Sequence, residues 1–523
     1  MIHLTEHVGP APLPASRLSG RLLFELKQAG LKAGSPAGVP APRRSVKLRR
    51  ILVALAFCGT AFADDPPPVL TAADVQAVVQ SAATSVNSTA LVIAVTDRVG
   101  NILAVFRKPD APATAIGNFS AIVDTNELAV ALARTGAFFS NSQAPLSSRT
   151  VRFISGTHFP AGVMYVDNGA LYGIENTNRG CTLTTNYLPG QAVPPATSID
   201  GTHPGLGPIT GKVDLFDSDQ SAVNPGGVPL YKNGVMVGGV GVAGVAPDVA
   251  EFAAFTGAVG AGFGPTSIAA PAVVFINGIA LPFVNQTTQP DGTSPGSFVG
   301  SFIVGPIDGP GPAPEGDLVA AQAGPVGGLT QVEVQGVVNR AIAAANETRA
   351  VIRLPIGSRA RFAIAVADLD GNVLALNRMP DATIFSNDVA VAKSRNVITF
   401  TRSLPGVPAG TAVTNRTLGF GAQPFFPPGI DYSSPGPFFD LYKFDVANPC
   451  VNPVVFFPGS LPLYKNGVLV GGLGISGDGV DQDDYVTAQA AQGFEAPDSI
   501  RADRVNVQGV HLPYLKFPRN PTN

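Results

Sequence analysis

Apolar and polar positions repeat with two different periods along the chain, and these periods predict helices and strands. Thr71 and Thr330 each open a stretch with apolar residues at helical spacing, so we expect two helices with these threonines as their N-caps. Apolar runs at residues 93–95 and 102–105 flank a polar turn at residues 97–101, a pattern typical of strand, turn and strand. A further hairpin is predicted at residues 233–234, because this Asn-Gly pair accepts the positive φ values of a type I′ turn.

The order of these elements predicts the fold class. Between residues 70 and 258 we expect, in this order, a helix, a hairpin, a second helix capped by Thr125, long loops, a second hairpin and a short helix. Hairpins build antiparallel sheets, and the helices between them must bury their apolar faces on the sheet. The sequence therefore predicts an α+β domain with an antiparallel sheet flanked by helices.

The same pattern occurs twice in the chain. Residues 229–244 read PLYKNGVMVGGVGVAG and residues 462–477 read PLYKNGVLVGGLGISG, so twelve of sixteen positions are identical. Residues 92–110 match residues 363–381 in the same order along the chain. We therefore predict two tandem copies of one domain.

These repeats set the expected domain boundaries. The first copy, with a C-terminal strand extension, is predicted at residues 64–285, and the second copy at residues 329–517. Residues 286–328 are rich in Pro and Gly and are expected to be a linker. The many glycines of residues 238–244 weaken a strand unless a packed helix, a partner subunit or a ligand approaches its backbone closely, and helix packing is the favoured explanation.

Charge separates the first 63 residues from the rest of the 523. They hold nine of the 34 Lys and Arg residues and two of the 37 Asp and Glu residues. Without them, 25 basic and 35 acidic residues remain, which lowers the net charge from −3 to −10. A nucleic-acid or anionic-membrane partner is disfavoured, because no basic stripe remains to bind it.

A signal peptide explains this difference in charge. Three basic residues within residues 46–50 precede an apolar run at residues 51–57 and a small-residue site at residues 61–63, so we expect cleavage before Asp64. Residues 1–45 suggest a misassigned start, with synthesis beginning at Val46. No later apolar run reaches the roughly 18 residues that span a membrane, so a periplasmic or secreted protein is expected.

Two cysteines, Cys181 and Cys450, remain after signal removal, one in each copy. A disulfide between the domains is possible in an oxidising compartment, and two buried thiols are the alternative.

At these motifs the chain resembles the GlcG/HbpS-like family, a haem-binding domain also found at the C-terminus of PduO cobalamin adenosyltransferases. The resemblance covers residues 70–258 and 329–495. Its marks are the strand pair "IAVxDxxGNxLA" followed by Arg and Pro-Asp, the helix with Lys393, and the closing "PLYKNG" motif. Copy two matches better, since copy one has Leu132 in place of Lys393.

The resemblance implies a profilin-like sandwich, haem binding and assembly into dimers or larger rings. We therefore expect an exported haem (tetrapyrrole) binding protein in which duplication makes a dimer within one polypeptide, with further homo-oligomers possible. The alternatives are a structural or assembly module that has lost the ligand, and a cofactor-dependent enzyme acting on a small organic acid.

His158 and Lys393 are candidates for holding this haem. His158 is the possible iron ligand and metal-binding residue of the first copy, and an ordinary loop histidine is the alternative, because the second copy has Phe425 there. Lys393 could pair with a haem propionate or an acidic residue, or lie on a solvated helix face.

Two further pairs of side chains occur in both copies. Arg149 matches Arg416, and a guanidinium group suits a carboxylate such as a propionate but can equally close a structural salt bridge. Tyr231 matches Tyr464, beside a hairpin turn where tyrosines are more often packing residues.

Motifs of enzymes are missing from the sequence. It holds no Ser/His/Asp order, P-loop, Cys-x-x-Cys or His-Glu-x-x-His, and the acidic run at residues 478–484 lacks EF-hand spacing. Binding rather than catalysis is therefore the expected role.

Overall fold

The computed structural model describes residues 67–179, 197–219, 224–265, 273–448, 450 and 452–522. These residues belong to one compact unit, Asp65–Asn523. The expected start extension, signal peptide and cleavage site lie outside the described residues, as does Cys181. Within the described ranges, no helix is both long enough and apolar enough to cross a membrane.

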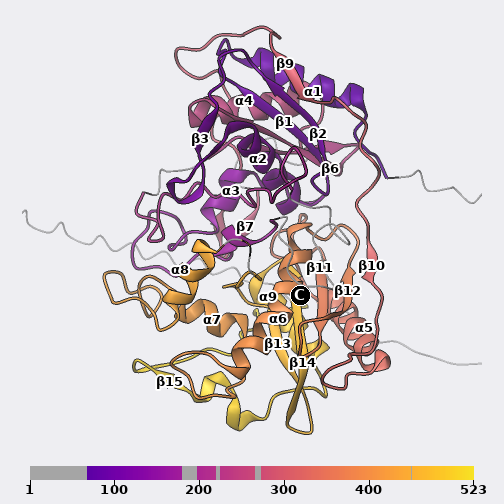
Figure 1. The fold of residues 1–523 in the computed structure, drawn as a ribbon, viewed down its shortest axis with the longest axis vertical. Coiled ribbons are helices and arrows are strands. Elements are labelled where there is room, and N and C mark those ends of the chain that lie inside the picture. The colour runs from indigo at the N-terminus through magenta and orange to yellow at the C-terminus, as the bar shows by residue number, and fades with distance from the viewer. Residues whose placement is uncertain are drawn as a thin grey trace, which may run out of the picture. The chain divides into compact units, whose positions relative to one another are not determined.

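The first copy folds around a five-stranded antiparallel sheet with the strand order β5-β6-β1-β2-β9 (Figure 1). Its strands are β1 (Val92–Asp97), β2 (Ile102–Arg107), β5 (Gly227–Lys232), β6 (Val235–Ala243) and β9 (Ser301–Val304). Its main helices are α1 (Ala72–Ser85), α2 (Thr125–Phe139) and α4 (Pro247–Gly260).

The second copy repeats this arrangement, with the strand order β10-β12-β11-β14-β13. Its strands are β10 (Gly316–Val319), β11 (Phe362–Ala367), β12 (Val373–Arg378), β13 (Ser460–Lys465) and β14 (Val468–Gly477). Its main helices are α5 (Gln331–Glu347), α6 (Phe385–Arg402) and α9 (Val480–Ala490). The predicted α+β class is confirmed by these two sheets and their helices.

Both copies also contain shorter helices and strands. The helices are α3 (Ser148–Phe153), α7 (Asn415–Gly421) and α8 (Phe439–Ala447), with single 3₁₀ turns at Asn118–Ser120, Ile174–Asn176, Asp498–Ile500 and Ala502–Arg504. Three small hairpins join β3 (Thr114–Ile116) to β4 (Ile122–Asp124), β7 (Phe275–Ile276) to β8 (Ile279–Ala280), and β15 (Asn506–Val507) to β16 (Val510–His511).

Each sheet lies between two layers of helix because successive side chains of a strand point to opposite faces. In β1, Ile93 and Val95 join the core cluster that contains α1 and α4. Val92 and Ala94 join the cluster that contains α2. Burial on both faces explains why the whole of β1 is apolar until its last two residues.

The predicted turns and caps are largely confirmed. Thr71 and Thr330 cap α1 and α5 with complete capping boxes. Asn233, with a φ of 53°, begins the tight turn between β5 and β6. The prediction that Thr125 caps α2 is wrong by one position, because the Asp124 carboxylate accepts hydrogen bonds from the backbone amides of residues 126 and 127.

The glycine-rich strands allow a helix backbone to lie directly on the sheet. A Cβ atom added at Gly241 would lie 2.0 Å from the carbonyl oxygen of Ala129 in α2, and one added at Gly474 would lie 2.0 Å from that of Ala390 in α6. Any side chain at these positions would push the helix away. Packing against a helix therefore explains the repeated motif.

Residues 286–328, expected to be a linker, also contribute to both sheets. β9 pairs with β2 and β10 pairs with β12, so each sheet gains an edge strand from the segment that connects the copies. Strands of four residues in a Pro- and Gly-rich segment give no pattern that distinguishes them from a loop.

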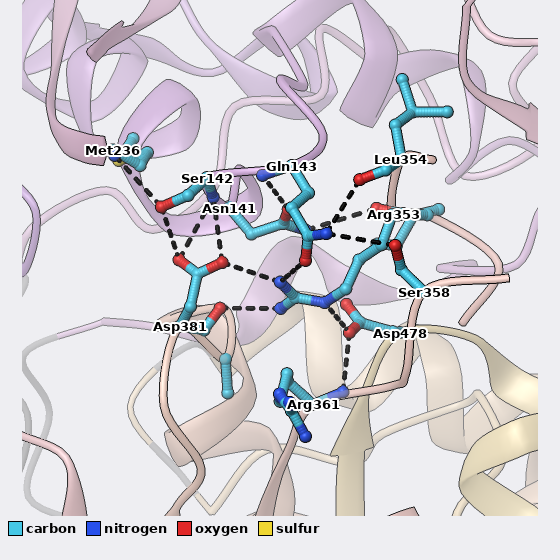
Figure 2. A network of polar contacts seen from close by, with 12 residues as sticks. Asn141, Ser142, Gln143, Met236, Arg353, Leu354, Ser358, Arg361, Asp381 and Asp478 are labelled. Carbon is cyan, nitrogen blue, oxygen red and sulfur yellow. Dashed lines mark hydrogen bonds and ion pairs between the residues drawn. The ribbon is translucent and has the colours of Figure 1, made fainter. Parts of the chain in front are cut away.

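The two copies share a hydrophobic core and a buried polar network. Phe139 of α2 stacks on Phe385 of α6 with ring centroids 4.3 Å apart. Figure 2 shows the polar network, in which Arg353 donates to Asp381 Oδ2 at 2.7 Å, to Gln143 Oε1 at 3.2 Å and to Asp478. Gln143 in turn donates to the carbonyl oxygen of residue 354 at 2.8 Å. Residues about 210 positions apart in the sequence are thus joined.

Candidate functional site

Arg149 and Arg416, at the starts of α3 and α7, form equivalent ion pairs in the two copies. Arg149 donates through Nε and Nη2 to Glu251 at 2.6 and 2.9 Å. Arg416 donates through Nε to Asp484 at 2.5 Å and through Nη2 to Asp481 at 2.6 Å. Burial lowers the pKa of Arg416, but its two carboxylate partners outweigh burial and raise that pKa above its ordinary value.

The carboxylates of these ion pairs also fasten the C-terminal extension of each copy. Glu251 accepts hydrogen bonds from the backbone amides of residues 285 and 286 at 3.2 and 3.1 Å. Asp484 accepts one from the backbone amide of Lys516 at 3.1 Å. Both arginines therefore have structural partners, which is one of the two roles that the sequence left open.

Lys393 is a buried residue of α6, not a residue of a solvated helix face. Its Nζ donates to Asp483 Oδ2 at 2.9 Å and to the carbonyl oxygen of Ile475 at 2.8 Å. Burial lowers the pKa of Lys393 and raises the pKa of Asp483 to about 7. The ammonium group points into the core of the second copy, where its partner is the acidic residue that the sequence offered as one alternative.

Tyr231 and Tyr464 are both buried beside the hairpin turns. The Tyr231 hydroxyl donates to the carbonyl oxygen of Asn141 at 2.9 Å. Burial raises the pKa of Tyr231 far above its ordinary value and that of Tyr464 to about 12. Both rings therefore pack as neutral phenols, which disfavours iron ligation through a phenolate.

His158 lies where a loop of the first copy meets the matching loop of the second. Its Nε2 is 2.9 Å from Asp431 Oδ1, and the Asp431 side chain is almost fully buried. Asp431 Oδ2 also accepts a hydrogen bond from the backbone amide of Tyr165 at 3.0 Å. No hydrogen bond to the other ring nitrogen, Nδ1, is found among the residues that the structure describes.

Exposed sulfur and aromatic side chains lie beside the pair formed by His158 and Asp431. Met164, Tyr165 and Tyr432 are 47%, 60% and 75% exposed. The two tyrosine rings meet edge to face with centroids 6.5 Å apart, and the Tyr432 hydroxyl is 3.8 Å from the Met164 sulfur. We call His158, Met164, Tyr165, Asp431 and Tyr432 the paired-loop site. The five residues come from both copies.

The backbone of this site is also unusual. Tyr165 has a φ of 58° and Tyr432 a φ of 64°, both in the left-handed region that bulky side chains rarely adopt. Such conformations persist only where the surroundings hold them, and they cluster at binding sites. The two tyrosines occupy matching positions, since each is two residues beyond the apolar residue that ends the aligned loop, Val163 or Ile430.

Sequence reasoning found His158 but missed the other four residues of the paired-loop site. Asp431 is 273 residues away from His158, and nothing local indicates their contact. The signal that could have found the site is the matching pair of tyrosines just beyond the aligned loops.

Other potential ligands of a metal ion lie elsewhere. His203 is exposed in a turn with Thr202, and His511 is exposed in β16. Cys450 is disulfide-bonded, which excludes a free thiol there, while the expected partner Cys181 lies outside the described residues. Among the described residues, no group of three or more His, Cys, Asp and Glu side chains could hold a metal ion.

Comparison with known proteins gives matches for part of the chain. Residues 329–492 match the family model described as haem degrading protein HbpS-like. The corrinoid adenosyltransferase PduO of Salmonella typhimurium (strain LT2) is 29% identical over 136 residues, which are 26% of this chain and 33% of that protein. The chain thus spans about a third of the length of this curated relative.

Three similar solved structures cover about a third of the chain. A PduOC–haem complex is 21% identical and aligns with 32% of this chain and 94% of its own, with a TM-score of 0.23. The Klebsiella pneumoniae protein ORFY is 21% identical, with 32% and 90% covered and a TM-score of 0.23. A double mutant of HbpS from Streptomyces reticuli is 18% identical, with 31% and 85% covered and a TM-score of 0.22.

Proposed function

Since the chain carries a domain of the HbpS-like family at residues 329–492, we propose that it is an exported protein that binds haem or a related tetrapyrrole. The proposed binding place is the paired-loop site. One observation carries this proposal: a His158–Asp431 pair lies beside the exposed side chains of Met164, Tyr165 and Tyr432. The proposed role is to bind the ligand, not to convert a substrate.

The side chains of the paired-loop site suit haem. Iron in haem proteins is held by His, Met, Tyr or Cys, and three of these residue types are present here. Histidines that bind a metal through one ring nitrogen usually engage a carboxylate or carbonyl through the other. His158 would therefore hold the iron through Nδ1, while Asp431 fixes the ring through Nε2. Bound haem would supply an iron ion able to change its oxidation state.

The tyrosine rings would contribute to binding in a second way. Exposed aromatic faces stack on flat apolar ligands and exclude water from them. Tyr165 and Tyr432 belong to different copies, so a ligand that contacts both rings needs both copies in contact. We infer that the tandem copies act as an intramolecular pseudo-dimer, and the stacked Phe139 and Phe385 at their shared core support this view.

Export is proposed from the signal-peptide pattern and the expected cleavage before Asp64. The disulfide at Cys450 supports it, because disulfides persist in oxidising compartments. N-terminal sequencing of the protein recovered from the periplasm or medium of an expressing cell tests this. A first residue of Asp64 is expected, and an intact residue 46–63 segment on the recovered protein would contradict export by cleavage.

A hemin titration of the full chain, followed by absorbance, tests the binding proposal. Saturable binding of one haem per chain is expected, with affinity at least about tenfold weaker in His158→Ala because the iron ligand is lost. His203→Ala is the matched control, since this exposed histidine lies outside the site. Equal affinity of His158→Ala and the unchanged chain would move the haem away from the paired-loop site, and no saturable binding would end the haem proposal.

A second candidate function is an assembly module that has kept the fold without the ligand. It is favoured by the internal partners of Lys393, Arg149 and Arg416, which leave none of these groups to bind a propionate. A stable oligomer of the ligand-free protein in light scattering, together with a failed hemin titration, would establish it.

A further inference from the structure

A cavity of about 330 Å³ lies in the first copy, where the end of β6 meets α2, the start of α4 and the β3–β4 hairpin. Its lining includes Ala115, Ile116, Leu132, Asn224, Val242 and Ala250. None of the described lining residues is charged, and Asn224 is the one with a polar side chain. The cavity is therefore apolar with a single amide group on its wall.

The second copy fills the equivalent place with larger and charged side chains. Counting from the shared motifs, Leu132 corresponds to Lys393, Ala250 to Asp483, and the Asn224 of Asn-Pro-Gly to the Phe457 of Phe-Pro-Gly. Lys393 pairs with Asp483 at 2.9 Å, and its Nζ lies 4.9 Å from the centre of the Phe457 ring.

The three replacements belong together physically. A buried ammonium group without its carboxylate, or the reverse, is strongly unfavourable, so both members of the pair must be absent for the place to become apolar. Leu132 and Ala250 meet that condition. Asn224 stands where the second copy has Phe457, so the first copy also lacks the aromatic ring that covers the ammonium group in the second. Any one of these replacements alone would leave an unpaired buried charge or an ammonium group without its covering ring. All three together leave an uncharged space.

The β3–β4 hairpin is a second feature peculiar to the first copy. Residues 107 and 378 match at a separation of 271, and residues 125 and 386 at a separation of 261, so the first copy has ten extra residues here. These residues form the hairpin, which contributes Ala115 and Ile116 to the cavity wall. Ile116 is 64% exposed, which places the hairpin at the mouth of the cavity.

We propose that this cavity binds one uncharged, flat, apolar molecule with a hydrogen-bonding group for Asn224. An apolar cavity of about 150 Å³ holds benzene, so a volume about twice as large suits a two-ring aromatic molecule. The proposal goes beyond haem binding and does not depend on it. No His, Met, Tyr or Cys lines the cavity within the described residues, so it offers no side-chain ligand for iron.

The test is a titration of the full chain with 1-naphthol, an aromatic of two rings with one hydroxyl group, followed by the fluorescence of the probe. The chain has no Trp whose emission would interfere. One saturable site per chain is expected. Ala250→Leu fills the cavity and should weaken binding at least about tenfold. Val259→Leu, on an exposed position of the same helix, is the matched control and should bind as the unchanged chain does.

A transplant of the cavity into the second copy sharpens the test. The triple variant Lys393→Leu, Asp483→Ala, Phe457→Asn opens the equivalent space but lacks the wall that the β3–β4 hairpin supplies, so it should bind a second molecule of 1-naphthol per chain more weakly than the first, provided that circular dichroism shows a native fold. Conversely, Leu132→Lys with Ala250→Asp should abolish the first site. Saturable binding that survives unchanged in a folded Ala250→Leu variant would overturn the proposal, as would the lack of saturable binding by the unchanged chain.

Discussion

The two copies keep the same ion pair at one position and differ completely at another only one residue away on the same helix. Glu251 and Asp484 both bind the arginine at the start of a short helix and fasten a C-terminal extension. Ala250, the neighbour of Glu251, lines an apolar cavity in the first copy. Asp483, the neighbour of Asp484, forms a buried ion pair in the second copy. An acidic side chain that holds several parts of the chain together is thus present in both copies. A side chain that pairs with one other side chain is instead replaced together with that partner.

The largest expected loss of stability comes from removing one member of the buried pair Lys393–Asp483 and keeping the other. Asp483→Ala leaves the Lys393 ammonium group buried without its carboxylate, and we expect a loss of about 3–5 kcal/mol in the free energy of unfolding. The double variant Lys393→Leu, Asp483→Ala, which copies the first domain, should lose much less. Urea unfolding above pH 7, where Asp483 is ionised in the folded chain, measures both losses, and an equal loss in the two variants would contradict the view that the pair is replaceable as a unit.

The pH dependence of stability comes next in size. Burial raises the pKa of Asp483 to about 7 in the folded protein from an ordinary value of 3.8, so the folded state keeps a proton that the unfolded state loses. This contribution to stability is full below pH 4 and is lost as the pH rises to 7, by an amount of a few kcal/mol. The first copy has Ala250 there and contributes nothing. Unfolding curves between pH 4 and 7 should therefore show a steeper decline for the unchanged chain than for the double variant.

A smaller loss of stability, of equal size in the two copies, is expected at the arginine ion pair that both copies share. Arg149→Ala and Arg416→Ala each leave a buried carboxylate without its guanidinium partner, but both arginine side chains are partly exposed, so a loss of about 2 kcal/mol is expected for each. Thermal unfolding of both variants tests this, with the exposed pair of Lys443 as control, because Lys443→Ala should change stability by less than about 0.5 kcal/mol. A much larger loss in one copy than in the other would show that the two ion pairs are not equivalent.

The smallest effect concerns the paired tyrosines of the paired-loop site. Tyr165→Ala and Tyr432→Ala should each weaken hemin binding roughly two- to tenfold, because each removes one aromatic face, and should leave stability nearly unchanged since both rings are exposed. Absorbance titrations of the two variants give the comparison. Normal binding by both would remove stacking on these rings from the proposed function.

Local sequence patterns predicted the elements that depend on neighbouring residues. The capping boxes of Thr71 and Thr330, the Asn-Gly turn and the helix packed on a glycine-rich strand all follow from residues close together in the chain. The edge strands β9 and β10 and the pairing of His158 with Asp431 depend on residues far apart, so no local pattern reveals them. The candidate site was predictable in one residue, His158. Lys393 and the arginines were predicted to face either a ligand or a protein partner, and their partners became evident only from the folded chain.

The connecting segment, finally, decides where the chain can be divided. An unpaired edge strand invites pairing with another molecule, and β9 and β10 cover the edges of β2 and β12 with strands from a single connector. A fragment that ends before residue 301 would therefore carry a bare sheet edge and a tendency to aggregate, and so would one that begins after residue 319. A division between residues 305 and 315 leaves both sheets covered, so any experiment that separates the two copies should cut there.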